Sequence, residues 1–213
     1  MAGFVFFSAL LFVLAGRIDY WQGWVFIAVS LGFLVLTLFI FRKNPEFIAE
    51  RLKPGPGVKK WDRVYMTLAA ICGIAMAVLA PLDAARFRWS RVPAGLYAAA
   101  VMTYIAGQSI FLWAKTANRF FSSMVRIQTD RGHTVCRGGP YKVIRHPGYV
   151  GGLLYQAAMP VLLGSLWGLV PQGIACLALI VRTALEDKTL QRELPGYADY
   201  AKEVRFRLIP GIW

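Results

Sequence analysis

Long uncharged runs of mostly apolar residues constrain this chain more than any other feature of its sequence. Residues 20–41, 64–82 and 92–113 carry no charged side chain, and neither does the longer segment 147–181. A helix needs about 20 apolar residues to cross the hydrocarbon core of a bilayer, so each of these runs is long enough to cross. The sequence therefore predicts an all-α fold, a polytopic membrane helix bundle.

The same runs predict how the bundle is connected. We expect four passes over residues 1–16, 20–41, 64–82 and 92–113, of which the first is short or tilted. Segment 147–181 is too long for one pass and slightly short for two, and glycines near its middle permit a turn. It is predicted to be a C-terminal helical hairpin with short arms that returns to the side it entered.

Two polar segments are predicted to form surface helices. Prolines and glycines divide the basic segment 42–63 into a short helix at about 45–52 and a turn. Residues 182–200 are amphipathic and charged, with the profile of a surface helix that ends near Leu194.

The positive charges predict the orientation of the bundle. The net charge is +13, and 20 of the 24 Lys and Arg residues lie in segments 42–63, 114–146 and 182–213. The predicted passes place these segments on one side, and loops rich in Lys and Arg are usually cytoplasmic. We therefore expect an integral, multi-pass protein whose termini and central polar segment face the cytoplasm. Nucleic acid is not an expected partner, because no basic-aromatic ladder accompanies the charge.

The cysteines indicate neither a disulfide framework nor a metal site. There are three, Cys72, Cys136 and Cys176, and no C-x-x-C spacing occurs. The sequence also lacks the signature motifs of hydrolases, P-loop nucleotide triphosphatases and dinucleotide-binding folds. A function in those classes is therefore not predicted.

The polar segment from Gln128 to Gly151 is the strongest candidate for chemistry. It contains the only two histidines of the chain, His133 and His146, and two tyrosines flank the second one. Its glycines and prolines forbid a regular helix, and irregular backbone near a bilayer persists only where protein or water satisfies its polar groups. We interpret the segment as a folded cofactor pocket at the membrane surface. The alternative from residue types alone is an ordinary basic loop between spans.

The predicted hairpin brings this segment close to the charged residues that follow it. His146 and Arg182 stand at its two membrane-surface ends, so they are expected to lie near each other. Arg182 and Glu186 are spaced i, i+4 and project from one helix face. In a functional interpretation Arg182 meets an anionic substrate group and Glu186 holds a cationic one. The alternative is a solvated surface ion pair between the two.

The sequence GGPYKVIRHPGYVGG at 138–152, preceded by HTVC at 133–136 and followed by RTALED at 182–187, resembles the isoprenylcysteine carboxyl methyltransferase family. That family is related to integral-membrane phospholipid methyltransferases. The resemblance covers somewhat less than the C-terminal half of the chain. It implies a cytoplasm-facing pocket for S-adenosyl-L-methionine, with S-adenosyl-L-homocysteine as the product. It also implies that the C-terminal segment caps the pocket and that a lipophilic acceptor enters sideways from the bilayer.

The resemblance further implies which residues of this sequence serve the site. The cofactor-binding set is Gln128, His133, Thr134, Val135, Cys136, Tyr141, His146, Pro147, Gly148, Tyr149 and Glu186. Arg182 matches the substrate-binding arginine, and Arg182 and Glu186 are the catalytic candidates. The family pattern has a run of acidic residues near Glu186, whereas here only Asp187 follows before Lys188.

These features together predict one integral-membrane methyltransferase domain over residues 1–213, with a four-span scaffold at 1–113 and a catalytic part at 114–213. The resemblance implies that the acceptor is the carboxylate of an isoprenylcysteine-like substrate, and such a carboxylate needs no general base. A phospholipid amine or a small thiol is the alternative acceptor and would need Glu186 or His146 as a base. A transporter and an inactive membrane partner are the non-enzyme alternatives, but the spans lack the ionisable residues and repeats of a transporter. The oligomeric state stays open.

Overall fold

The regular structure of this chain is entirely helical over the residues that the computed structural model describes, which are 2–43, 50 and 55–213. The predicted short helix at about 45–52 lies outside these residues apart from position 50. The α-helices are α1 (Ala2–Ala15), α2 (Trp21–Phe41), α4 (Lys60–Pro81), α5 (Ala94–Ala117), α6 (Pro147–Leu162), α7 (Leu169–Glu193) and α8 (Tyr197–Glu203). A π-helical turn, η1 (Leu82–Phe87), and two 3₁₀ turns, η2 (Thr129–Arg131) and η3 (Gly139–Lys142), complete the described elements.

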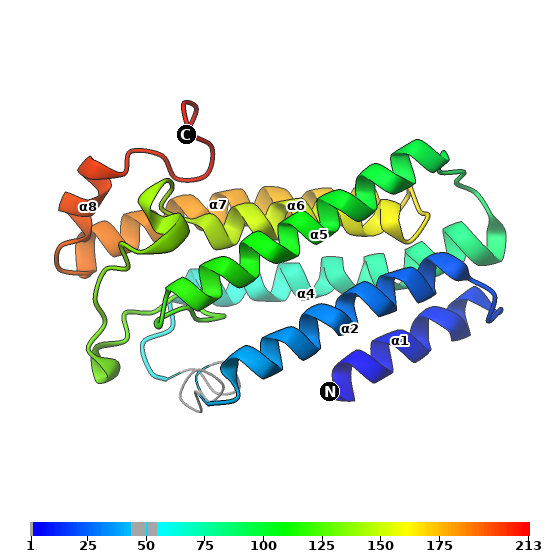
Figure 1. Ribbon diagram of the computed structural model, residues 1–213, viewed down its shortest axis with the longest axis horizontal. Coiled ribbons are helices and arrows are strands. Elements are labelled where there is room, and N and C mark those ends of the chain that lie inside the picture. Colours follow the sequence, from blue (N-terminus) through cyan, green and yellow to red (C-terminus); the bar gives the residue numbers. More distant parts are fainter. Residues whose placement is uncertain (1, 44–49, 51–54) are drawn as a thin grey trace.

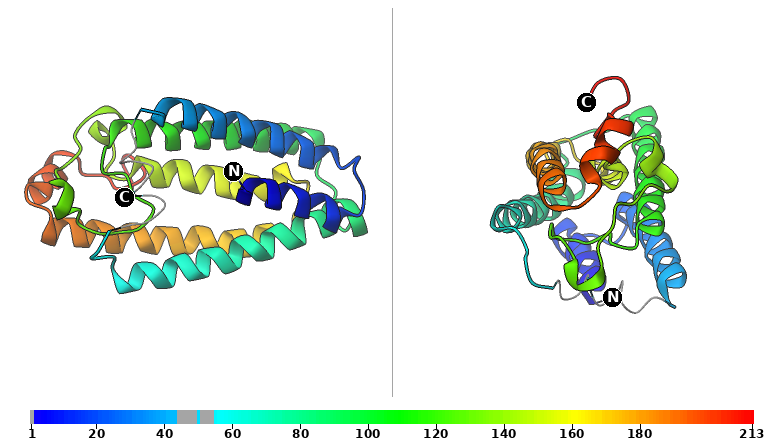
Figure 2. Two further views of the ribbon diagram at one scale, coloured as in Figure 1. Left: turned by 90° about the horizontal axis from the view of Figure 1, so that it is seen from below. Right: turned by 90° about the vertical axis from the view of Figure 1, so that its left-hand side faces the viewer.

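The long helices run along the long axis of the molecule as a membrane bundle (Figure 1). Four of the described helices are long and apolar enough to cross a bilayer: α2, α4 with η1, α5 and α7. Helix α1 has only 14 residues, or ~21 Å at ~1.5 Å per residue, and begins partway along the bundle (Figures 1 and 2). The predicted all-α membrane bundle with a short first helix is therefore confirmed.

Helices α6 and α7 form the predicted hairpin. They run in opposite directions, and a turn at residues 163–168 joins them (Figure 1). Gly164 adopts a φ of 79°, which disfavours other residue types, and Ser165 N donates to Pro160 O to close the turn. The second arm differs from the prediction because α7 continues without a break to Glu193. Residues 182–193 are thus the end of a membrane helix and not a separate surface helix.

The basic segments gather at one end of the bundle. The end of α2, the start of α4, the loop between α5 and α6, and the residues after α7 all lie at the left-hand end of Figure 1. The α1–α2 link, η1 and the turn of the hairpin lie at the opposite end. This grouping agrees with the predicted topology, while the assignment of the basic end to the cytoplasm stays a prediction.

Close contact between α5 and α6 fixes where the chain enters the loop between them. A Cβ added at Gly151 on α6 would lie 2.6 Å from Gly107 O and from Phe111 N on α5. A Cβ at Gly107 would lie 2.5 Å from Tyr155 N. Glycine at both positions therefore lets the two backbones touch, as small residues do in other membrane helix pairs.

Candidate active site at the basic end of the bundle

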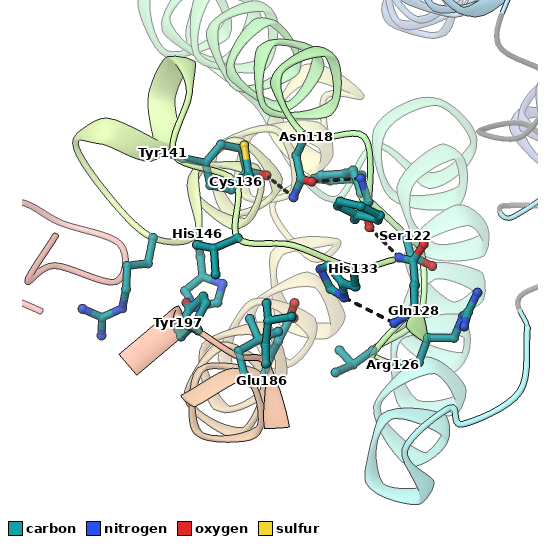
Figure 3. A pocket seen from close by; sticks show the side chains of 18 of the residues that line it. Asn118, Ser122, Arg126, Gln128, His133, Cys136, Tyr141, His146, Glu186 and Tyr197 are labelled. Atoms are coloured by element: carbon teal, nitrogen blue, oxygen red, sulfur yellow. Dashed lines mark hydrogen bonds between the residues drawn. The ribbon is translucent and has the colours of Figure 1, made fainter. Parts of the chain in front are cut away.

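A cavity that is partly open to solvent lies at the basic end of the bundle (Figure 3). Its walls come from the start of α6, from the end of α7, from α8 and from residues 118–146, which join α5 to α6 and are called the pocket loop below. The predicted site residues that line it are Gln128, His133, Thr134, Val135, Cys136, Tyr141, His146, Gly148, Tyr149, Arg182 and Glu186. Pro147 does not line the cavity, because it is buried as the first residue of α6. Residues far apart in sequence are thus brought together, while their roles stay predictions.

Glu186 projects into the cavity from α7 (Figure 3) and pairs with a tyrosine rather than with Arg182. The hydroxyl of Tyr149 donates a hydrogen bond to Glu186 Oε2. No described residue donates to Glu186 Oε1, so this carboxylate oxygen is available to a ligand. The ring of His146 lies parallel to that of Tyr149, with 5.6 Å between the ring centres.

Asp187, the next residue on α7, is a fully buried hub behind the cavity. Its carboxylate accepts hydrogen bonds from Arg145 Nε at 2.7 Å and Arg207 Nε at 2.8 Å. The hydroxyl of Tyr197 donates to it at 3.1 Å, and His146 Nε2 lies 3.2 Å from Oδ1. The hub therefore joins the pocket loop, α7, α8 and the residues after α8. The sequence did not predict a role for Asp187, which was noted only as the one acidic residue after Glu186. Its position next to a predicted site residue could have indicated one.

The C-terminal tail, residues 204–213, is hydrogen-bonded to the pocket loop. Arg145 N donates to Phe206 O at 2.9 Å, and His146 N donates to Arg207 O at 3.0 Å. Arg145 Nη1 also donates to the carbonyls of Val204 and Arg205. Figure 2 (right) looks onto this end of the bundle, where the tail rises from α8 at the front of the view. The tail thus holds the backbone of Arg145 and that of the predicted cofactor residue His146.

His133 organises the opposite wall through its neutral ring. Its Nδ1 accepts a hydrogen bond from Gln128 N at 3.3 Å, and its ring packs on that of Phe120 at 4.6 Å. Burial, with the nearby charges of Arg126 and Arg131, lowers the pKa of His133 to about 4. The side chain of Gln128 is itself used within the loop, because Nε2 donates to Phe120 O at 2.7 Å.

Tyr141 and Cys136 line the cavity next to Asn118 (Figure 3). Asn118 Nδ2 lies 3.5 Å from the Tyr141 hydroxyl, and Tyr200 donates to the Tyr141 carbonyl at 2.6 Å. Burial raises the pKa of the Tyr141 hydroxyl and that of the Cys136 thiol, so both stay protonated near neutral pH. Neither side chain therefore provides an ionised nucleophile near neutral pH.

Arg182 is buried and is held by a residue that the sequence reading did not single out. Its Nε donates to Asp62 Oδ1 at 2.7 Å, and its Nη2 donates to Ser123 O at 2.9 Å. The alternative of a solvated ion pair with Glu186 is thus wrong, since each of these two side chains has another partner. Arg182 nevertheless lines the same cavity as His146, as the hairpin predicted.

Comparison with known proteins bears on the part of the chain that builds this cavity. A search of curated proteins gives no match. Residues 98–192 match the isoprenylcysteine carboxyl methyltransferase (ICMT) family, and this range contains the pocket loop and most of α5, α6 and α7. The resemblance read from the sequence is thereby confirmed for the segment that carries the site, which is similar to the ICMT family of methyltransferases.

Proposed function

We propose that this protein transfers a methyl group from S-adenosyl-L-methionine to the carboxylate of a lipophilic, isoprenylcysteine-like acceptor at the cytoplasmic face of the membrane. The observation that carries this proposal is one cavity that joins Arg182 and Glu186, one turn apart on α7, to the His146–Tyr149 run. It lies where a membrane helix ends, so a lipophilic acceptor can reach it from the bilayer.

The residues present fit the methyl donor. When bound, the donor supplies an electrophilic methyl group on a sulfonium. Glu186 Oε1 offers a hydrogen-bond acceptor to the ammonium or ribose of the donor. Aromatic rings of Tyr141 and Tyr149 line the cavity, where they suit stacking on adenine or contact with a cation. A Cβ at Gly148 would lie 2.6 Å from the Phe121 ring, so glycine at this position lets the start of α6 pack against Phe121 in the cavity wall.

The polar groups also fit a carboxylate acceptor. Such an acceptor arrives already ionised, so the site needs no general base and can work by positioning and by exclusion of water. Arg182 can hold one acceptor oxygen by a charge-assisted hydrogen bond and leave the other to attack. The lowered pKa of His133 suits a site that binds a sulfonium, because a neutral ring adds no positive charge to the cavity.

Calorimetry with S-adenosyl-L-homocysteine tests the donor site. We expect the purified wild-type protein to bind it, and Glu186→Gln to weaken binding about tenfold or more, because a hydrogen bond to a charged group contributes ~1.5–3 kcal/mol. Glu203→Gln is the matched control, since Glu203 is an exposed carboxylate on α8 that pairs with Arg137 outside the cavity. A wild-type protein that binds neither the donor nor this product would rule out the proposed function.

A labelled-methyl assay on native membranes tests the reaction. We expect the label in a lipophilic product that mass spectrometry identifies as a methyl ester, with a rate that is flat between about pH 6 and 8. Label in an amine or a thioether, or a rate that rises steeply over this range, would reassign the acceptor to the amine or thiol class.

A further inference from the structure

Arg182, the arginine proposed to bind the acceptor, pairs with the carboxylate of Asp62, which lies outside the residues 98–192 that match the family. Asp62 lies in the first turn of α4 and is fully buried. Its Oδ1 accepts Arg182 Nε at 2.7 Å, and its Oδ2 lies 3.3 Å from Arg182 Nη2. We propose that Asp62 is a positioning residue for methyl transfer, which orients Arg182 toward the acceptor carboxylate. This inference rests on the proposed function and extends the site to the N-terminal half of the chain.

The surroundings of the guanidinium leave it one free edge. Nε and Nη2 are bonded to Asp62, and Nη2 also donates to Ser123 O. The rings of Tyr65 and Tyr149 lie 4.5 and 5.3 Å from the guanidinium carbon. Among the described residues no carboxylate or backbone carbonyl accepts a hydrogen bond from Nη1, the Tyr65 hydroxyl is a further hydrogen-bond partner of the guanidinium, and Arg182 lines the cavity. The N–H groups of Nη1 are therefore the ones that remain for an acceptor.

Asp62 is itself fixed in place. Val125 N of the pocket loop donates to Asp62 Oδ2 at 2.7 Å, and Lys59 N donates to Val125 O at 3.1 Å. Lys59 Nζ also pairs with Glu193 at the end of α7. The start of α4 is thus bonded to the pocket loop and to α7, which both line the cavity, and Asp62 cannot turn away without breaking these contacts.

The Asp62–Arg182 ion pair affects how an acceptor carboxylate is recognised. Because Asp62 neutralises Arg182, an acceptor carboxylate meets an ion pair of zero net charge and not a free positive charge. Its binding then depends on the direction of the Nη1 hydrogen bonds, and a change in that direction costs catalytic rate because the reacting atoms are misaligned. A purely structural ion pair would instead affect the amount of folded protein and leave the rate per folded molecule unchanged.

Asp62→Asn in the full-length protein tests the inference against a matched control, Asp83→Asn. Asp83 is also fully buried, but lies in η1 at the other end of the same helical segment, where it accepts a hydrogen bond from Ser165 Oγ at 2.6 Å. Both variants are expected to lower the melting temperature. Activity is measured with a small S-prenylated N-acylcysteine and divided by the number of sites that bind S-adenosyl-L-homocysteine in calorimetry.

We expect Asp62→Asn to lower kcat/KM for the acceptor at least tenfold and to leave the Kd for S-adenosyl-L-homocysteine within twofold of wild type. Asp83→Asn should keep both quantities within twofold. Because Asp62 acts through Arg182, adding Asp62→Asn to Arg182→Ala should cause no further loss of kcat/KM.

Two results would overturn the inference while the proposed function stands. One is a wild-type kcat/KM per binding site in Asp62→Asn, and the other is a further tenfold loss when Asp62→Asn is added to Arg182→Ala. A wild-type protein that binds S-adenosyl-L-homocysteine but methylates no acceptor removes the inference together with the proposed reaction.

Discussion

Arg182 and Glu186 lie one helical turn apart on α7, yet they do not pair with each other. Glu186 accepts a hydrogen bond from Tyr149, and Arg182 pairs with Asp62. Among the described contacts, Oε1 of Glu186 accepts no hydrogen bond, and Nη1 of Arg182 donates to no carboxylate or backbone carbonyl. At this scale the site is defined less by which residues are present than by which of their atoms remain free.

His133 predicts how stability depends on pH. Its pKa is about 4 in the folded protein, below the ~6.5 of an exposed histidine, so the unfolded chain binds more protons between these values. The contribution of the neutral ring is therefore complete above about pH 6.5 and is lost as the pH falls toward 4. We expect the melting temperature to fall over this range in wild type.

His133→Asn is the variant that isolates this effect. Its side-chain oxygen can accept the hydrogen bond of Gln128 N in place of Nδ1 but does not titrate. The melting temperature of this variant, measured by scanning calorimetry in detergent, should depend less on pH between 6.5 and 4. Equal slopes for variant and wild type would exclude His133 as the source.

At the scale of elements, α5 and α6 must touch for the pocket loop to begin and end where it does. Gly151→Ala adds a methyl group 2.6 Å from the backbone of α5, and overpacking of this kind costs ~1–3 kcal/mol. We expect a lower melting temperature. Gly173→Ala on α7 is the control, because nothing lies within 4 Å of the added Cβ, and its melting temperature should be unchanged or slightly higher. Equal behaviour of the two variants would refute this account of the helix contact.

The Asp187 hub predicts that the C-terminal tail depends on one carboxylate of α7. Asp187→Asn leaves Arg145 and Arg207 without their buried counter-charge, and breaking a buried pair costs ~3–5 kcal/mol. We expect early proteolytic cleavage in the tail and weaker binding of S-adenosyl-L-homocysteine.

Asp199→Asn provides the comparison, since Asp199 and its partner Lys202 are exposed on α8 and such pairs contribute little. It should show neither change. A tail that stays protected from protease in Asp187→Asn would show that the other contacts suffice to hold it.

At the scale of the whole molecule, the grouping of basic segments at one end predicts the orientation in the membrane. Lys202 on α8 and Arg91 after η1 are both exposed and lie at opposite ends of the bundle. We expect a cysteine at Lys202, in a Cys136→Ser background, to react with a membrane-impermeant maleimide only after cells are permeabilised. A cysteine at Arg91 should react in intact cells. Reversed labelling would place the pocket on the outer face.

Much of the architecture is readable from the sequence because the bilayer imposes a strong local rule. An uncharged run of sufficient length must form a helix there, since every backbone polar group needs a partner within the segment. That rule places α2, α4 and α5 within a few residues of their ends, and it gives the start of the α6–α7 hairpin. It does not show that α7 continues past Val181, because the charged residues beyond it are equally compatible with a separate surface helix.

The sequence by itself determined a helical membrane protein and its hairpin, and eleven of the twelve site residues predicted from it line one cavity. Hydropathy is a property of contiguous residues, and the motif that resembles the ICMT family is also contiguous. Only the tertiary structure decided the partners of the charged groups. Asp62 and Arg182 are 120 positions apart, and Arg145 and Asp187 are 42 apart. No local pattern links such positions, because a buried charge selects its counter-charge by distance in space after the helices have packed.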